Sequence, residues 1–229
     1  MLKYAKCFWK GQRICRKDLK KKLPITASIL NKIYDSLNGD KCSLLQLRTI
    51  SMLILGFADF MRYSETSDLK RCDFIFRDTH LEVFLEKSKT DIYRDGHWLF
   101  LSKLDFRLCP IKLMRRNFDK AQIGDDTDEY IFRSVTYFKT VNRHSLRRRN
   151  VPLSYSTARD IVLSVIKEVG LDPQNFGLQR SGGATAAANF GVPDRLFKKH
   201  GRWKSDRAKD GYIQDSVKLL LSMSSNLDL

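Results

Sequence analysis

The sequence predicts a mostly helical domain of the α+β class that contains one small, three-stranded antiparallel sheet. Over most of the chain, apolar residues recur at the spacing of amphipathic helices. Between residues 73 and 101, three short runs rich in aromatic and β-branched residues replace that pattern, as strands do. With 229 residues, 42% of them apolar, the chain can bury the core of one large domain or two small ones.

The part of the chain before the sheet predicts a basic arm followed by helices. Residues 1–24 hold nine lysines and arginines against one acid. Helices are expected over about 27–38 and 43–60, with a short third helix after them. Each expected helix follows or begins at a hydroxyl residue that favours the N-cap position: Thr26, Ser43 and Ser64.

The three strands of the sheet are expected at 73–76, 81–85 and 97–101. Residue pairs typical of turns lie between them: Arg77-Asp78 and Asp95-Gly96. The link between the last two strands is unusually polar. Together these features predict a compact antiparallel sheet rather than strands separated by helices.

Helices resume after the sheet. The spacing of apolar residues predicts helices near 107–120 and over about 156–169, with a basic loop at 142–149 between them. In the last third of the chain, the small residues 181–188 predict a close-packed helix. Two further helices are expected there, one that starts at Pro193 and one over about 205–221.

The charge of the chain predicts a polyanionic partner. Lysine and arginine number 42 against 26 aspartates and glutamates, a net charge of +16. Nucleic acid is the commonest polyanion bound by proteins of this kind, although membrane-surface binders share the same balance. No apolar stretch is long enough to span a membrane. Five cysteines without a CxxC pair predict neither a disulfide framework nor a zinc site, and fit a reducing compartment.

Three groups of residues have a composition that packing alone does not require. The first is Arg62 with Glu65 three residues later, directly after a strongly apolar segment. A charge set against an apolar core needs an oppositely charged partner or an anionic ligand. A structural ion pair between Arg62 and Glu65 and an anion site both satisfy this requirement.

The second group is Arg180 followed by the small residues 181–183. Small neighbours leave room for a guanidinium to reach a phosphate and bind two of its oxygens; the alternative is a helix-start arginine that faces solvent. The third group is the segment 200–203, His-Gly-Arg-Trp, followed by Tyr212 beside Gly211. Aromatic residues next to glycines in a polar segment are not a helix-core pattern, and a surface aromatic pair is the alternative to a site.

Taken in order, these groups resemble the catalytic set of the tyrosine recombinase (phage integrase) family. The segment 62–65, Arg-Tyr-Ser-Glu, resembles the family's first-arginine box, and Lys89 resembles its β-hairpin lysine. Arg180 lies 23 residues before Trp203 and 32 before Tyr212, close to the family's spacing. The stretch from Arg180 to Tyr212 is similar to the eukaryotic, transposon-associated branch of the family, and the resemblance covers roughly residues 24–220.

The resemblance implies that the chain breaks and rejoins DNA through a 3′-phosphotyrosine. Tyr212 would be the nucleophile that attacks the scissile phosphate. Arg62 and Arg180 would neutralise the charge that builds up on the non-bridging oxygens. The phosphotyrosine conserves the energy of the broken bond, so the resemblance implies neither a cofactor nor a metal ion.

The resemblance also assigns roles to the remaining motif residues. Lys89 would protonate the leaving 5′-oxygen, and Trp203 would donate its indole N–H to the phosphate. Glu65 and His200 would support the catalytic residues. DNA contacts are expected from the basic residues Lys87, Arg147, Arg148, Arg149, Arg202 and Lys204.

The second-arginine box departs from the family pattern. The family's box reads His-x-x-Arg, whereas Gly177 stands three residues before Arg180. Related sequences of this branch resemble Phe-Gly-Leu-His-Ser-x-Arg, which implies that two residues are missing here. A similar His-x-x-Arg motif starts at His144, but Arg147 lies 65 residues before Tyr212 in a basic loop, so a phosphate-backbone contact is the better interpretation.

Two main hypotheses follow from this departure. The chain is an active recombinase, or it is a domesticated or degraded copy that binds DNA without cleaving it. A type IB topoisomerase-like enzyme would use the same chemistry, but the Gly-Arg-Trp and Arg-Ser-Gly-Gly motifs argue against it.

The resemblance further implies how the protein is organised around its DNA. Residues 25–229 correspond to the catalytic domain, and residues 1–24 to a linker that would follow a missing core-binding domain. Duplex DNA is the expected partner, bound by a homotetramer on paired sites if the protein is full length and active. The segment after Tyr212 would be exchanged between protomers, as it often is in the family, or would pack on its own domain. The expected location is the nucleus if the protein is eukaryotic, and the cytoplasm otherwise.

Overall fold

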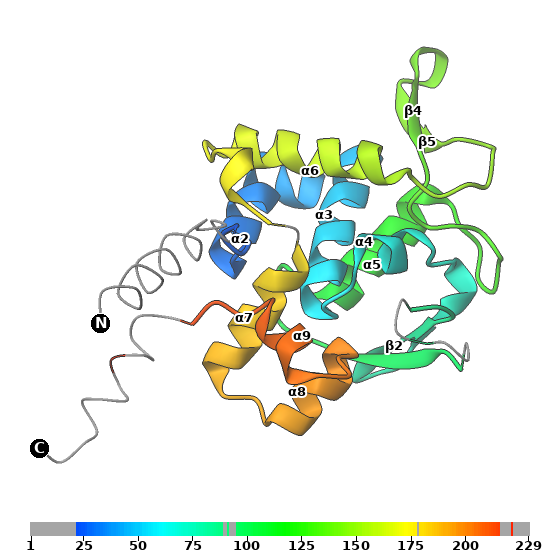
Figure 1. Cartoon of the computed structure of the whole chain (residues 1–229). Coiled ribbons are helices and arrows are strands. Elements are labelled where there is room, and N and C mark those ends of the chain that lie inside the picture. The colour runs from blue at the N-terminus through cyan, green and yellow to red at the C-terminus, as the bar shows by residue number, and fades with distance from the viewer. Residues whose placement is uncertain (1–21, 89–90, 92–94, 178, 216–220, 222–229) are drawn as a thin grey trace, which may run out of the picture.

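A computed structural model of the chain describes residues 22–88, 91, 95–177, 179–215 and 221 (Figure 1). Its helices are α2 (Ala27–Ser36), α3 (Leu44–Ala58), α4 (Tyr63–Ser67), α5 (Pro110–Ala121), α6 (Tyr155–Glu168), α7 (Gln179–Phe190), α8 (Asp194–Gly201) and α9 (Asp206–Asp210). Its strands are β1 (Phe74–Phe76), β2 (His80–Leu85), β3 (His97–Ser102), β4 (Val135–Phe138) and β5 (Arg143–Leu146). The predicted fold class, mostly helical with a small antiparallel sheet, is confirmed.

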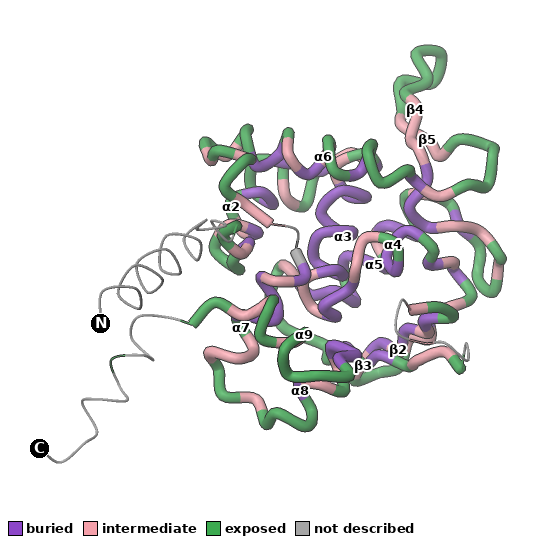
Figure 2. The backbone as a smooth tube through the Cα atoms, in the orientation of Figure 1, coloured by how far each residue is buried: buried purple, intermediate pink, exposed green. Residues whose placement is uncertain are grey.

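Helix α3 forms the centre of the core. Ser43 caps its start, and the Gln46 side chain accepts a hydrogen bond from the Ser43 N–H, at 2.8 Å. Eleven of the fifteen residues of α3 are buried, which is the expected state of a helix that is apolar on all sides. Figure 2 shows this helix in the interior of the molecule, and α2, α5, α6 and α7 all contact it.

Two glycines bring α7 into backbone contact with the segments around α3. A Cβ on Gly182 would lie 2.0 Å from the carbonyl oxygen of Ile25, and one on Gly183 would lie 1.8 Å from that of Phe57. Any larger residue would force the two backbones apart. The predicted close packing of this helix is therefore confirmed, and it sets Arg180 beside the end of α3.

The three-stranded sheet has the order β1-β2-β3, with antiparallel pairing throughout. Val83 in the middle strand pairs with Phe74 on one side and Leu99 on the other. Alternate residues of β3 point inward and outward, so that Leu99 is buried while Trp98 and Phe100 are exposed. The strand positions agree with the sequence-based prediction to within one residue.

The prediction of a basic loop at 142–149 is partly wrong, because the first half of this segment is a strand. Arg143–Leu146 forms β5 and pairs with Val135–Phe138, or β4, in a hairpin that projects from the body of the domain (Figure 1). The β-branched and aromatic run of β4 was the available signal. The partner strand β5 is basic and lacks the alternation of apolar and polar residues that predicts a strand. A hairpin that projects from the domain does not need this alternation, because neither of its faces is buried.

Two helix termini also differ from the prediction. Ser64 lies inside α4 rather than capping it; Arg62 is at the N-cap position, and its N–H donates to the Glu65 carboxylate at 2.8 Å. The last helix, expected over 205–221, ends at Asp210. Tyr212 therefore follows the helix in a turn, and residues 216–220 of the expected helix lie outside the described residues.

Leu23, which the sequence assigns to the basic arm, is attached to the domain. Its N–H donates to the carbonyl of Asn175 at 2.7 Å, and its carbonyl accepts from the N–H of Gly177 at 2.9 Å. The segment before α7 is thus held by the chain that leads into α2. None of the helices in the described part of the chain is long and apolar enough to cross a membrane.

Candidate active site

Four of the residues that the sequence singled out come together from different elements. Arg62 stands at the start of α4, and Arg180 lies in the first turn of α7. Trp203 follows α8, and Tyr212 follows α9. Lys89, the expected general acid, lies outside the described residues.

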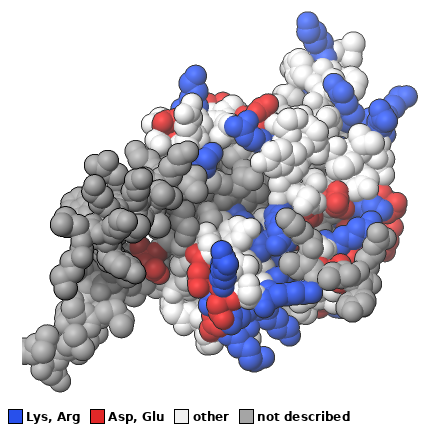
Figure 3. All heavy atoms as spheres, in the orientation of Figure 1, with Lys and Arg blue, Asp and Glu red and all other residues white. Residues whose placement is uncertain are grey.

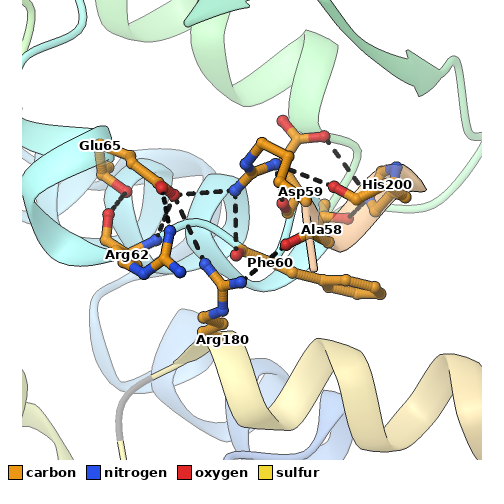
Figure 4. Close-up of polar contacts among 10 residues, drawn as sticks. Ala58, Asp59, Phe60, Arg62, Glu65, Arg180 and His200 are labelled. Atoms are coloured by element: carbon orange, nitrogen blue, oxygen red, sulfur yellow. Dashed lines mark hydrogen bonds and ion pairs between the residues drawn. The ribbon is translucent and has the colours of Figure 1, made fainter. Parts of the chain in front are cut away.

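Glu65 links the arginines of this site (Figure 4). Its side chain is 2% exposed, and Nη1 of Arg62 donates to its Oε1 at 2.6 Å. Its other oxygen, Oε2, lies 3.6 Å from Nη1 of Arg180 and accepts from Nη2 of Arg202 at 2.8 Å. The expected ion pair between Arg62 and Glu65 therefore exists, but it is one part of a cluster of three arginines around one carboxylate.

The charges around Glu65 keep it ionised. Burial by itself raises the pKa of a carboxyl group, since it disfavours the charged form. Arg202, the N–H of Arg62 and the guanidinium groups of Arg62 and Arg180 outweigh burial, so the pKa of Glu65 is lowered. An ionised carboxylate is the partner that the buried guanidinium groups need.

Arg180 is buried, so the alternative of a helix-start arginine facing solvent is wrong. Its Nη2 donates to the carbonyl of Gly201 at 2.7 Å, and its guanidinium lies over the rings of Trp203 and Tyr212, at 5.0 and 4.8 Å from their centroids. Burial, and then repulsion from Arg62, lower the pKa of Arg180 to about 10, which leaves it protonated at neutral pH. Among the described residues, Nε and Nη1 of Arg180 have no hydrogen-bond partner.

Trp203 is also buried, which excludes a surface aromatic pair for this residue. Its ring stacks on Phe197 at 5.1 Å and lies 5.7 Å from the ring of Tyr212. A Cβ on Gly201 would lie 1.9 Å from the indole, so the Gly-Arg-Trp motif needs its glycine for close approach. The indole Nε1 is buried and finds no hydrogen-bond acceptor in the part of the chain that the structure describes.

The backbone of Tyr212 is fixed while its side chain stays partly accessible. Its N–H donates to the carbonyl of Lys209 at 2.9 Å, and its carbonyl accepts from Oγ1 of Thr185 at 3.3 Å. Tyr212, Arg62 and Arg180 line a cavity of about 610 Å³. This volume exceeds that of a single phosphate group.

His200 is turned toward the end of α3. Its Nε2 donates to the carbonyl of Ala58 at 2.9 Å, and its ring lies edge-on against Phe60 at 4.7 Å (Figure 4). Burial lowers the pKa of His200, and repulsion from Arg202 adds to this although the bond to Ala58 opposes it. His200 is therefore neutral at pH 7. Its hydrogen bond to Ala58 supports the loop that precedes Arg62.

The prediction that Arg202 contacts DNA is wrong. The residue is buried, and its guanidinium is bonded to Glu65 and to the carbonyl oxygens of Asp59 and Phe60. Arg202 adopts a left-handed backbone conformation, φ +56°, that turns its side chain inward while its neighbour Lys204 stays exposed. A run of adjacent basic residues gives no signal for which of them faces the interior.

The other expected DNA contacts lie on the surface. Lys87, Lys204 and the segment 147–149 are exposed. Figure 3 shows basic side chains over the β4–β5 hairpin and over α8 and α9, on the same face of the molecule. Contact of these residues with DNA stays a prediction.

Asp59 is a feature of the site that sequence reasoning missed. Its carboxyl is completely buried, 3.8 Å from Nε2 of His200, and neither of its oxygens has a hydrogen-bond partner among the described residues. An acid inside the apolar run Gly-Phe-Ala-Asp-Phe at 56–60 was the available signal. In the described ranges, no group of three or more His, Cys, Asp or Glu side chains is arranged to hold a metal ion.

Gly177, which stands where the family pattern has its histidine, lies beside the attachment of Leu23. A Cβ there would meet Oγ of Ser181 at 3.5 Å and Cβ of Lys22 at 3.6 Å, which are ordinary contacts. A side chain at this position is therefore sterically possible. Glycine is not required by the local backbone.

Comparison with known proteins agrees with this architecture. No protein-family model matches the chain. An integrase/recombinase xerD homolog from Selenomonas ruminantium is 27% identical over 196 residues, which cover 84% of this chain and 54% of that protein. The chain thus spans about half the length of the curated relative it matches.

Solved structures share the fold at lower identity. XerH site-specific recombinase in a post-cleavage complex with palindromic difH substrate has a TM-score of 0.68 and 15% identity, over 94% of this chain and 56% of that one. XerA recombinase has a TM-score of 0.61 and 16% identity, over 98% and 73%. The Tn1549 transposon integrase bound to circular intermediate DNA has a TM-score of 0.58 and 10% identity, over 97% and 74%.

These relatives do not test the assignment to a eukaryotic, transposon-associated branch, which stays a prediction. The sequence relative and the structural neighbours agree on the family itself. The chain has the fold of the tyrosine recombinase catalytic domain, and its sequence is similar to that of an integrase/recombinase.

Proposed function

We propose that this domain cleaves and rejoins duplex DNA through a covalent bond between Tyr212 and a 3′-phosphate. The observation that carries the proposal is the position of the Tyr212 ring against the guanidinium of Arg180, whose Nε and Nη1 have no hydrogen-bond partner among the described residues. Buried donors without acceptors are rare in folded proteins and here point to a missing anion. A phosphate that accepts from these groups would sit beside the Tyr212 hydroxyl.

The residues divide the reaction between them. The Tyr212 hydroxyl attacks the phosphorus and loses its proton, while the bond to the 5′-oxygen breaks and that oxygen gains a proton. Arg62 and Arg180 stabilise the charge on the non-bridging oxygens, and preorganised donors of this kind contribute strongly to catalysis. Lys89 is the proposed source of the proton for the 5′-oxygen. Attack by a 5′-hydroxyl on the phosphotyrosine then reverses the step and joins the strands.

A second function is favoured by one specific residue, Gly177. Without the histidine of the family pattern, the site lacks one proton-transfer and hydrogen-bonding group. Such a group contributes roughly 10²–10⁴-fold to a rate. The alternative proposal is therefore a domain that binds DNA through phosphate contacts and cleaves it slowly or not at all.

A trapping assay separates the two functions. A pool of duplexes of varied sequence, each with 5′-bridging phosphorothiolate linkages, would be incubated with the protein. A thiolate leaving group needs no general acid and rejoins poorly, so covalent complexes accumulate. We expect a denaturant-stable protein–DNA adduct that is absent in Tyr212→Phe and retained in Tyr130→Phe, a change of the same kind outside the cavity.

The assay also has a result that would overturn the proposal. If the wild-type protein binds the duplexes but forms no adduct, the cleavage function fails and the binding function stands.

A homotetramer on paired sites and a nuclear location are further proposals that rest on the family resemblance. Sedimentation of the DNA complex tests the first, and imaging of the tagged protein in its host cell tests the second.

A further inference from the structure

The guanidinium of Arg202 donates hydrogen bonds to several residues of the site although its side chain is buried. Its side chain is 5% exposed. Nη1 donates to the carbonyl oxygens of Asp59 and His200, at 3.2 and 2.9 Å. Nη2 donates to the carbonyl of Phe60 at 3.3 Å and to Oε2 of Glu65 at 2.8 Å.

These contacts join the segments that carry the proposed catalytic residues. Asp59 and Phe60 form the reversal between α3 and α4, where Phe60 has a left-handed backbone with φ +50°. The carbonyl groups at a helix C-terminus lack intrahelical partners and carry partial negative charge, so a cation stabilises them. Arg202 supplies that cation and at the same time ties the reversal to α8.

The contact with Glu65 has a further consequence for Arg180. Oε2 of Glu65 accepts from Arg202 at 2.8 Å, whereas Nη1 of Arg180 stays 3.6 Å away. A carboxylate that is already neutralised by a close guanidinium attracts a second one less strongly. The Nη1 and Nε donors of Arg180 are thereby left for another acceptor.

We infer that Arg202 is a positioning residue: by satisfying Glu65 from inside the protein, it keeps Arg180 available to a phosphate. Without Arg202, Arg180 would close onto Glu65 and its donors would be withdrawn from the cavity. This inference rests on the proposed function for its consequence in catalysis. Its structural part, the state of Arg180, is independent of cleavage.

The first test measures cleavage separately from binding. Arg202→Met keeps an apolar stem of similar length but removes the guanidinium. We expect the cleavage rate of the bound complex to fall by about 100-fold, the effect of a misplacement of roughly 1 Å in an active site. The Kd for DNA should stay within about twofold, because the side chain is buried. Lys32→Met, at an exposed lysine outside the expected DNA contacts, should change neither the Kd nor the rate of the bound complex.

Two further variants guard against a merely structural explanation. Arg202→Lys keeps a cation near Glu65 and should recover part of the rate. In the Glu65→Gln background, Arg202→Met should lower the cleavage rate much less than in the wild type, because Arg202 is inferred to act through its contact with Glu65. If Arg202→Met does not fold, as judged by its thermal transition, Arg202→Lys carries the test. A normal cleavage rate in a folded variant without the Arg202–Glu65 contact would overturn the inference.

A second readout needs no cleavage at all. Inorganic phosphate would be titrated against the protein with ¹⁵N-labelled arginine while the Nε–Hε signal of Arg180 is followed by NMR. We expect the signal to move at lower phosphate concentration in the wild type than in Arg202→Met. Equal titrations would overturn the inference. If the wild type responds as expected but forms no DNA adduct, the proposed function fails and the positioning role stands.

Discussion

At the scale of single residues, the site is organised around the carboxylate of Glu65. It accepts hydrogen bonds from Arg62 and Arg202 and forms an ion pair with Arg180. Three cations that would repel one another in an apolar interior are held together by one buried anion. The cost of burying that anion is offset because each of its oxygens has a charged donor close by.

Asp59 is a second buried carboxyl with the opposite electrostatic outcome. Burial raises its pKa to about 8, and Arg202 only partly opposes this. Between its ordinary pKa near 4 and pH 8, the folded protein keeps the proton while the unfolded chain has released it. Stability therefore falls as the pH rises through this range, by about 1.4 kcal/mol per pH unit for one such group.

We therefore expect Asp59→Asn to flatten the loss of stability between pH 7 and 8. His200 does not contribute in this window, because its lowered pKa changes stability only below about 6.5. The measurement is the free energy of unfolding from urea titrations at several pH values. Asp105→Asn, at an exposed position, should keep the wild-type slope. Equal slopes for Asp59→Asn and the wild type would contradict the assignment of a proton to Asp59.

Motif spacing predicted which residues gather at the site, but not how each one is used. Arg62, Arg180, Trp203 and Tyr212 do come together, since each lies at the start of an element or in a turn that the family spacing locates. Arg202 could not be assigned from sequence, because its inward direction depends on one left-handed backbone angle. The roles of these residues in catalysis stay proposals until the variants are measured.

At the scale of elements, the junction between the N-terminal segment and α7 determines where Arg180 lies. Leu23 is bonded to Asn175 and Gly177 just before the helix begins, and two glycines of α7 then allow backbone contact beyond it. These contacts fix the helix along its axis. They therefore set where Arg180, in the first turn of α7, enters the site.

The two residues that the family pattern has and this chain lacks would enter at that junction. We expect insertion of His-Ser before Gln179 to raise the rate of adduct formation by roughly 10²–10⁴-fold, the contribution of one general acid–base group. The measurement is single-turnover formation of the covalent complex on a nicked duplex with ordinary phosphodiester linkages, whose leaving 5′-oxygen still needs a proton.

An Ala-Ser insertion of the same length is the matched control. It changes the register of the segment without supplying an imidazole, so its rate should stay low. If both insertions raise the rate equally, register rather than the histidine limits cleavage. An unchanged rate in the His-Ser variant would mean that the absent histidine is not the limiting feature.

Elements with a buried face were predicted well, and exposed elements were not. The helix α3 and the three-stranded sheet are set by apolar periodicity, and their caps and turns follow local rules. The β4–β5 hairpin and the short α9 bury little, so tertiary context rather than hydrophobic pattern decides their structure.

At the scale of the whole molecule, the net charge of +16 favours association with polyanions such as DNA. Exposed basic residues lie over the β4–β5 hairpin and near α8 and α9 on one face (Figure 3). The cavity with Tyr212 is itself lined by two cations, Arg62 and Arg180. Binding through such residues is governed by release of counterions from the phosphates.

Changing Arg147, Arg148 and Arg149 together to glutamine should weaken DNA binding and reduce its salt dependence. Each lost phosphate contact lowers the slope of log Kd against log salt by about 0.9, so three contacts give a decrease of about 2 to 3. Fluorescence anisotropy over a range of salt concentrations measures the slope. Lys32→Gln, a surface change outside the expected contacts, should leave it unaltered. An unchanged slope in the triple variant would remove the hairpin from the DNA interface.

The chemical identity of the covalent adduct tests the central claim of this account most directly. The trapped protein–DNA complex would be digested with protease and nuclease, and the nucleotide-bearing peptide sequenced by mass spectrometry. The account predicts a single modified residue, Tyr212, joined to the 3′-phosphate of a nucleotide. A nucleotide on any other residue, or a 5′-phosphate link to Tyr212, would contradict it.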